Sequence, residues 1–234
     1  TASGIDFFNN LLDVHEKPNP EYPRTRSHGI KLEGCSHTLV HHNFSRAIAD
    51  KEFGDAAPLD FSVGTHSANR VFNNTVVAER SGNAGDYWAA SINLVEPEPD
   101  SLTQVHDNVF RTSQWHVRGD WGGSRDFTFT GNRFELVGAS ADYQFAFFPQ
   151  SRAAITGNLV FRDCELVGGR AHGARADLRK ARGLYAETRL DLPVEWTVRL
   201  HVVDPAGSPL NGVLIVAREA GKSVAEAVTD ANGE

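Results

Sequence analysis

The chain has 234 residues, of which 40% are hydrophobic and 23% are charged. A chain of this length and apolar content can bury one or two domain cores. Its 23 basic and 30 acidic residues give a net charge of −7, which argues against a generally basic nucleic-acid-binding protein. No apolar run approaches the roughly 18–20 residues of a membrane-spanning helix. Two cysteines are too few for a disulfide-stapled scaffold.

A repeat of about 31 residues runs along most of the chain. Its anchor position is asparagine in every unit but the last, with spacings of 33, 31, 34, 24 and 32 residues: Asn10, Asn43, Asn74, Asn108, Asn132 and Cys164. The position before each anchor holds Asn9, His42, Asn73, Asp107, Gly131 and Asp163. Because Asn, Asp and Gly accept left-handed backbone geometry, this second column predicts a turn just before each anchor.

Short segments with alternating apolar residues flank each turn. Three residues before the anchors stand Phe7, Val40, Val71, Val105, Phe129 and Phe161, and two residues after them stand Leu12, Ser45, Val76, Phe110, Phe134 and Leu166. We align the inward pairs of a further segment as Ile30 with Leu32, Phe61 with Val63, Ile92 with Leu94, Trp115 with Val117, and Phe145 with Phe147. Alternation with a period of two predicts β-strands, and no stretch of these units keeps a helical period.

Each unit is therefore two or three short strands joined by bends, and it cannot bury its apolar face alone. Stacking the units in register buries that face and aligns the anchors into a ladder of side-chain amides. This arrangement is an all-β solenoid, a parallel β-helix with coils about 4.8 Å apart. The alternative is a β-sandwich, which explains the short strands but not the recurring anchor.

The segments at 27–34 and 131–134 resemble the generic coils of right-handed parallel β-helix proteins of the pectate-lyase-like superfamily. The resemblance covers residues 1–190 and implies about six coils. It implies a fold rather than an activity, because such coils occur in lyases, hydrolases, epimerases, adhesins and phage tailspikes.

The coil count separates the two cysteines. Cys35 lies in the coil of Asn43, and Cys164 lies four coils later, about 19 Å along the axis. Since a disulfide needs Cα atoms within about 7 Å, we expect two free thiols. Cys164 occupies an anchor position and is expected to be a small packing residue in place of asparagine.

From residue 191 the pattern changes. Strand-like alternation at Trp196, Val198, Leu200 and Val202 is followed by Asp204-Pro205-Ala206-Gly207-Ser208-Pro209-Leu210, an apolar run at 213–216, and Thr229-Asp230-Ala231-Asn232-Gly233. These residues resemble the carboxypeptidase-regulatory-like β-sandwich, a non-catalytic accessory module. The resemblance implies an incomplete module over 191–234, in a chain that is a segment of a longer polypeptide.

Two groups of side chains have open interpretations. His37, His41 and His42 lie close together; we interpret them as bend and surface residues, with a metal site as the alternative, and we assign no metal ligands. A basic stretch follows the last clear coil, at Arg170, Arg175, Arg179, Lys180 and Arg182. Ala174, Leu178 and Ala181 could form the apolar stripe of a short helix, and we expect a polar helix or a loop here that caps the stack. Contact with an anionic polysaccharide is the alternative.

An active site should lie on the outward face of the segment that precedes the anchor strands, where a long groove suits a polymer. With Val117 inward, His116, Arg118 and Asp120 would share this face in solvent, and they are the preferred catalytic cluster. Candidates for substrate binding are His28, Lys31, Glu33, Asp60 and Arg125, with Asn93 on the same face. The alternative is a solvated strand with an ordinary salt bridge.

Two functions remain open. The first is a secreted or cell-surface protein that binds or acts on an acidic polysaccharide, as a polysaccharide lyase or glycoside hydrolase. Elimination at a uronic acid needs Arg or Ca²⁺ to neutralise the sugar carboxylate, and Lys, Arg or His as the base. The second is a non-catalytic extracellular scaffold or adhesin. The Gly-His-Gly and Arg-Ile-Lys motifs of polygalacturonases are absent, as are the Arg-x-Pro-x-x-Arg and Trp-Ile-Asp-His motifs of pectate lyases.

Overall fold

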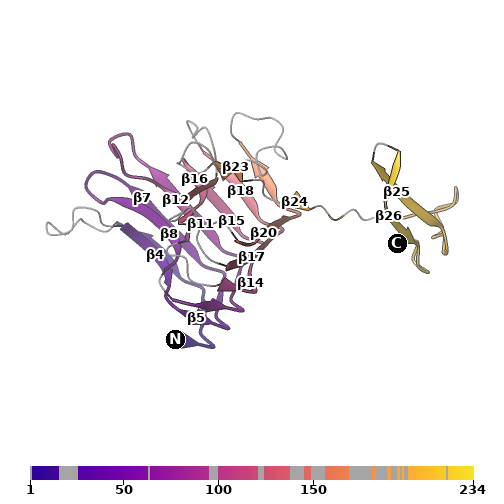
Figure 1. The fold of residues 1–234 in the computed structure, drawn as a ribbon, viewed down its shortest axis with the longest axis horizontal. Helices are drawn as coiled ribbons and strands as arrows, with labels where there is room; N and C mark the ends of the chain where they lie inside the picture. Colours follow the sequence, from indigo (N-terminus) through magenta and orange to yellow (C-terminus); the bar gives the residue numbers. More distant parts are fainter. Residues whose placement is uncertain are drawn as a thin grey trace. The chain divides into compact units, whose positions relative to one another are not determined.

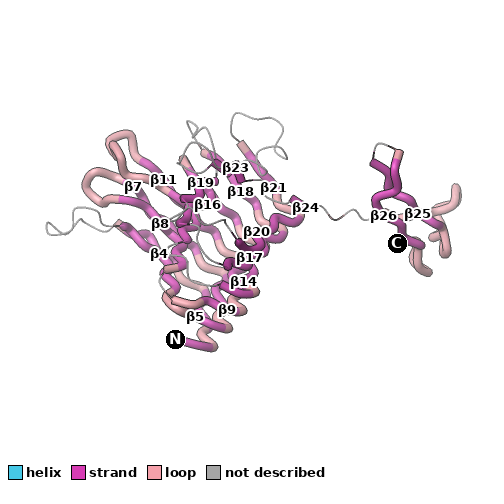
Figure 2. The backbone as a smooth tube through the Cα atoms, in the orientation of Figure 1, coloured by secondary structure: helices cyan, strands magenta, loops and turns pink. Residues whose placement is uncertain are grey.

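A computed structural model describes residues 2–15, 26–62, 64–94, 100–120, 124–137, 145–148, 156–168, 181–182, 189–190, 194–195, 197, 200–219 and 221–234. The chain divides into two compact units, Thr1–Glu195 and Trp196–Glu234. In the described residues all regular structure is β (Figure 2). No helix among them is long and apolar enough to cross a membrane.

Four parallel sheets form a solenoid in the first unit, and from β1 to β16 the chain visits them in turn (Figure 1). The first sheet holds β1 (Ala2–Ser3), β5 (Cys35–Ser36), β9 (His66–Ser67) and β13 (Asp100–Ser101). The second holds β2 (Asp6–Phe8), β6 (Leu39–His41), β10 (Arg70–Phe72), β14 (Thr103–His106), β17 (Ser124–Thr130), β20 (Thr156–Arg162) and β24 (Val194–Glu195).

The other two sheets follow the anchor turn. The third holds β3 (Leu11–Val14), β7 (Phe44–Ala49), β11 (Thr75–Arg80), β15 (Val109–Thr112), β18 (Arg133–Leu136) and β21 (Glu165–Val167). The fourth holds β4 (Arg26–Leu32), β8 (Asp55–Phe61), β12 (Ala90–Leu94), β16 (Trp115–Asp120) and β19 (Phe145–Phe148). Neighbours within a sheet lie one coil apart in the sequence, so the unit is a β-solenoid, as predicted.

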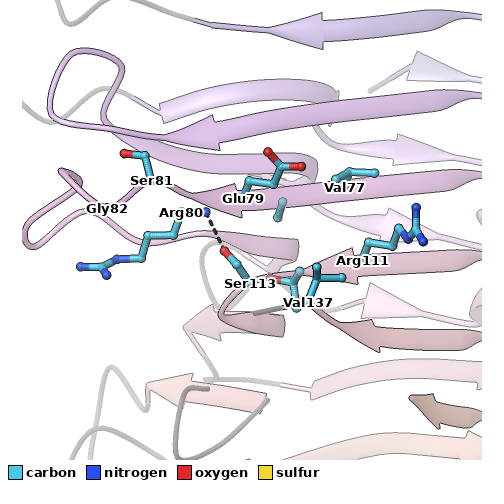
Figure 3. A pocket seen from close by; sticks show the side chains of 10 residues that line it. Val77, Glu79, Arg80, Ser81, Gly82, Arg111, Ser113 and Val137 are labelled. Atoms are coloured by element: carbon cyan, nitrogen blue, oxygen red, sulfur yellow. Dashed lines mark hydrogen bonds between the residues drawn. The ribbon is translucent and has the colours of Figure 1, made fainter. Parts of the chain in front are cut away.

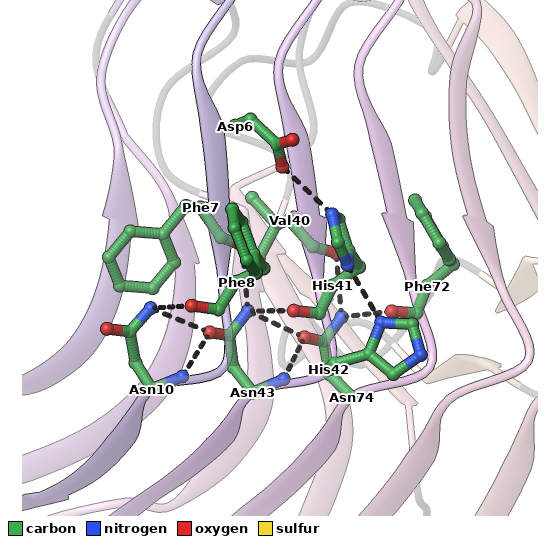
Figure 4. Close-up of polar contacts among 10 residues, drawn as sticks. All are labelled: Asp6, Phe7, Phe8, Asn10, Val40, His41, His42, Asn43, Phe72 and Asn74. Carbon is green, nitrogen blue, oxygen red and sulfur yellow. Dashed lines mark hydrogen bonds and ion pairs between the residues drawn. The ribbon is translucent and has the colours of Figure 1, made fainter.

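The anchor residues form the predicted ladder at the corner between the second and third sheets (Figure 4). The backbone N–H of Asn43 and its side-chain Nδ2 donate to Asn74 Oδ1 at 3.0 and 2.9 Å. The same pair of bonds links Asn74 to Asn108 and Asn108 to Asn132. Each buried polar group at this corner thereby has a partner in the next coil, which is what burial requires.

Cys164 ends this ladder as a substitute for asparagine. Its Sγ lies 3.5 Å from Phe129 O and 3.4 Å from Arg162 O, contacts equivalent to those that Asn108 Nδ2 makes with Val71 O and His106 O. Both cysteines are buried free thiols, as predicted.

The turn column has the predicted left-handed backbone. The φ angles lie between 52° and 62° at Asn9, His42, Asn73, Asp107, Gly131 and Asp163. A β-carbon makes this region costly for most residues, and Asn, Asp and Gly bear that cost best. The column therefore holds these residues because of its backbone geometry.

The core lies between the sheets and contains predicted inward residues of each predicted segment, but Trp115 lies outside it at the register position of His28. One predicted alignment is also wrong by two residues. Phe61 pairs with Leu32 rather than Ile30, and Val117 pairs with Ile92 rather than Leu94. A two-residue shift keeps each side chain on its face, and these residues are buried all the same. Val63 and the side chains of Phe145 and Phe147 lie outside the described part.

In the fourth sheet, the alternation of inward and outward side chains fails at the position of Gly29 and at the positions paired with it in the neighbouring strands. A Cβ on Gly29 would lie 1.9 Å from Ser45 Oγ of β7, so position 29 faces the third sheet and must be glycine. Ser91, in the same column two coils later, donates its hydroxyl to Arg111 O of β15 at 3.0 Å. The adjacent Ile30 is also in the core. The positions of Gly29 and Ile30, and the residues paired with them in neighbouring strands, therefore both face inward.

The second unit contains an antiparallel hairpin of β25 (Leu214–Glu219) and β26 (Lys222–Val228). Asp204 Oδ1 accepts N–H bonds from Ala206 and Ser208, and Asp230 Oδ1 accepts them from Asn232 and Glu234, so both predicted turns are present. The predicted strand is absent at 200–202, where Val202 bonds the backbone of Gly233 instead. Trp196 and Val198 lie outside the described part.

The predicted capping helix is wrong where it can be compared. Ala181–Arg182 form β22, which pairs antiparallel with β23 (Arg189–Leu190). Arg170, Ala174, Arg175, Leu178, Arg179 and Lys180 lie outside the described residues.

Candidate functional site

A continuous chain of polar side chains crosses four coils on the outward face of the fourth sheet. His28 Nδ1 lies 2.7 Å from Asp60 Oδ2, and Asn93 Nδ2 donates to Asp60 Oδ1 at 2.9 Å. Arg118 Nη1 in turn donates to Asn93 Oδ1 at 2.9 Å. Asp60, Asn93 and Arg118 occupy one register position of β8, β12 and β16. We call His28, Asp60, Asn93 and Arg118 the polar row.

The polar row is built to hold a buried carboxylate. Asp60 is 1% exposed and Asn93 is fully buried. A buried carboxylate is tolerated where it is paired and hydrogen-bonded. Asn93 Nδ2 hydrogen-bonds to Asp60 Oδ1, and His28 Nδ1 lies within ion-pair distance of Oδ2 without forming a hydrogen bond to it. The Asn93 amide presents its nitrogen to the carboxylate and its oxygen to the guanidinium. The contact of His28 with Asp60 is made by Nδ1, so Nε2 is the ring nitrogen directed away from Asp60.

An aromatic and cationic rim adjoins the polar row. The Arg118 guanidinium lies 4.1 Å from the ring centroid of Trp88, and that of Arg26 lies 5.5 Å from it. Trp115 stacks on Trp88 with centroids 6.4 Å apart. Asp55 Oδ1 accepts the backbone N–H of Trp88 at 2.9 Å, which fixes the segment that enters β12. Sequence reasoning missed Trp88 and Arg26; the tryptophan beside a predicted strand was the available signal.

The structure unites some of the predicted site residues and separates others. His28, Asp60, Asn93 and Arg118 come together, with Arg118 within reach of an adjacent coil as predicted. Lys31 and Glu33 form their own exposed ion pair. The side chains of Asp120 and Arg125 lie outside the described part.

The prediction that His116 faces solvent is wrong. His116 is fully buried, and its ring meets that of Phe134 from β18 edge-on at 5.1 Å between centroids. The cause is the break in alternation, because His116 occupies the column of Gly29 and Ser91, which faces the third sheet. His116 is therefore a core residue and no member of a groove cluster.

The outward face of the third sheet carries ion pairs beside a cavity. Arg46 bonds Glu79 at 2.8 Å, and Glu135 accepts from Arg133 and Arg111, which lowers the pKa of Glu135. A cavity of about 620 Å³ adjoins these pairs, lined by Val77, Glu79, Arg111, Ser113, Val137 and the loop at 80–82 (Figure 3). Glu79 and Arg111 of the lining are paired with Arg46 and Glu135, whereas Arg80 donates to the backbone carbonyls of Gly85 and Tyr87.

The polar row does not fit Ca²⁺. Calcium takes six to eight oxygen ligands, whereas Asp60 supplies the row's only carboxylate, with one oxygen hydrogen-bonded to Asn93 and the other beside His28. Within the described residues no group of three or more His, Cys, Asp or Glu side chains is placed to hold a metal ion. The positively charged group that the polar row offers is therefore the Arg118 guanidinium rather than a Ca²⁺ site.

Comparisons with protein-family models, with curated proteins and with solved structures found no match to this chain.

Proposed function

We propose that this chain is a secreted or cell-surface β-helix protein that binds an acidic polysaccharide along the polar row and acts on it as a polysaccharide lyase. One observation carries the proposal: a histidine, a buried carboxylate, an amide and a guanidinium from successive coils are linked by one ion-pair contact and two hydrogen bonds beside Trp88. Coils about 4.8 Å apart present such groups at regular intervals, which suits an extended polymer.

The rim supplies recognition. Guanidinium groups bind carboxylates through paired N–H donors, and Arg26 and Arg118 both lie at Trp88. Indole rings offer an apolar surface for the C–H face of a sugar. An acidic sugar is therefore the ligand that this combination favours over a neutral one.

His28 supplies the base. The Asp60 carboxylate lies 2.7 Å from Nδ1 as an ion-pair partner, and its negative charge favours the imidazolium that forms when Nε2 accepts a proton. In the elimination, His28 takes the proton from the carbon next to the sugar carboxylate. The C–H electron pair forms a carbon–carbon double bond as the bond to the glycosidic oxygen breaks, and that oxygen leaves with a proton from solvent.

The experiment incubates the full chain with a panel of uronic-acid polymers and neutral polysaccharides, with and without Ca²⁺. We expect binding to acidic polymers alone, and ultraviolet-absorbing unsaturated products without added Ca²⁺. His28→Gln should abolish product release while retaining binding. Arg46→Gln, on the outward face of the third sheet, is the matched control and should change neither. Absence of binding and product with every acidic polymer would refute the proposal.

A non-catalytic scaffold is the second candidate, and the burial of Asp60 and Asn93 favours it. A polar row that serves only to join coils would contribute stability and no ligand affinity. In that case His28→Gln would lower the melting temperature, and wild type would bind no polymer in the panel.

A further inference from the structure

Two neighbouring histidines converge at the anchor corner of the second coil, away from the polar row. His41 Nδ1 and His42 Nδ1 lie 2.8 Å apart (Figure 4). On its other side, His41 Nε2 lies 2.8 Å from Asp6 Oδ1. An ionised carboxylate only accepts hydrogen bonds, so the proton on His41 Nε2 is directed at Asp6. The two Nδ1 atoms therefore share one proton between them.

The ring of His41 is held rigidly. It stacks between Phe8, at 5.2 Å and 4°, and Phe72, at 4.8 Å and 16°. His42 sits in the turn column with φ of 55°, and its side chain is exposed. One imidazole is thus stacked between two rings, and the other is exposed to solvent, with edge contacts to His41 and Phe72.

We propose that His41 Nδ1 and His42 Nδ1 bind a divalent transition-metal ion, Ni²⁺ or Cu²⁺, in place of the shared proton. Metal–imidazole bonds of about 2.0–2.1 Å at angles of about 90–110° place the two nitrogens roughly 2.8–3.4 Å apart. The present separation of 2.8 Å lies at the lower end of that range, and a small rotation of His42 directs both nitrogens at one ion. Asp6 then has the role of the carboxylate that holds the far N–H of a metal-bound histidine. Water fills the remaining positions, since imidazole nitrogen suits these ions.

The repeat itself supplies variants that should fold. Asparagine occupies the position of His42 in the coils on either side, as Asn9 and Asn73, with φ of 57° and 54°. Phenylalanine occupies the position of His41 in those coils, as Phe8 and Phe72. His42→Asn and His41→Phe therefore place residues that this backbone already accepts.

His106 provides the matched control. It lies in the same column as His41, stacks on Phe72 at 5.0 Å, and has its own carboxylate partner in Asp107, 2.8 Å from Nδ1. Its neighbour is an aspartate instead of a second histidine, so it has one imidazole only. His106→Phe should leave metal binding unchanged.

The test titrates Ni²⁺ alone into the full chain, by calorimetry and by NMR of the histidine rings. In wild type we expect one saturable site, with the His41 and His42 signals broadened first. His42→Asn and His41→Phe should each weaken binding about tenfold or more, and circular dichroism should show that both remain folded. Equal affinity in His42→Asn, first broadening at other histidines, or no binding at millimolar Ni²⁺ would overturn the assignment.

Discussion

Asn74 directs two donors at one atom: its backbone N–H and its side-chain Nδ2 both reach Asn108 Oδ1 at 2.9 Å. Asn108 Nδ2 in turn donates to Val71 O and His106 O, each at 2.9 Å. Asn108 is fully buried. One side chain thus satisfies polar groups of three successive segments that have no access to water.

Asn108→Leu should therefore lower the free energy of unfolding by about 3 kcal/mol, because buried donors and acceptors lose their partners. Urea denaturation followed by circular dichroism measures this. Asn10→Leu, in the first coil, is the comparison and should cost less, because no residue of the described part donates to its side-chain oxygen. Equal losses in the two variants would contradict the ladder's energetic role.

His116→Ala should lower the free energy of unfolding by about 2–4 kcal/mol, the range for removing a large buried side chain. A histidine on a solvated strand would cost less than about 0.5 kcal/mol. The same denaturation experiment separates the two, with His37→Ala at a turn position as the control. A negligible change in the free energy of unfolding of His116→Ala would show that His116 faces solvent on the outward side of the sheet.

Asp60→Asn should destabilise the fold by about 3 kcal/mol, since it breaks a buried, hydrogen-bonded pair on one side. Glu33→Gln is the matched control. Glu33 pairs with Lys31 at the surface, where an ion pair contributes less than about 1 kcal/mol. Comparable losses in both variants would show that burial of the polar row has no energetic consequence.

Burial raises the pKa of the Cys164 thiol to about 11. The folded state thus favours the neutral thiol, and this stability is present in full below the unfolded-state pKa of about 8.5. It is lost as the pH rises through 11, by roughly 3 kcal/mol. Unfolding measured from pH 7 to 11 should show this loss relative to Cys164→Asn, which lacks the thiol.

Cys164→Asn should also be at least as stable as wild type at pH 7. Asparagine at the end of the ladder would offer Oδ1 to Asn132 Nδ2, which now meets Sγ at 3.9 Å. A gain of about 1 kcal/mol is expected from one improved hydrogen bond. A less stable variant would mean that the last anchor site has adapted its packing to sulfur.

The parts of the fold that repeat are the parts that the sequence predicts well. The left-handed turns follow from Asn9, Asn73 and Asp107, because few residues bear that backbone geometry. A single sequence contains no comparable signal for the break in alternation at Gly29 and His116. There the direction of a side chain depends on how closely β7 approaches β4, a distance between segments rather than a local preference.

The candidate site shows the same division. Asp60, Asn93 and Arg118 follow from alternation after the break, whereas His28 lies before it and reaches the row only because two columns turn inward. Trp88 precedes its strand and belongs to no periodic column, so its place beside Arg118 depends on tertiary packing.

The anchor ladder has a direction. The backbone N–H of Asn43 finds its acceptor on Asn74, and that of Asn74 finds its acceptor on Asn108. Each coil thus relies on a side chain that the ribosome adds about thirty residues later. During synthesis the backbone N–H of the most recent anchor residue has no side-chain acceptor until the next coil is made. Folding of the ladder therefore lags one coil behind synthesis. A chain truncated within the solenoid would leave the last anchor N–H without its acceptor, where a strand from another molecule could pair.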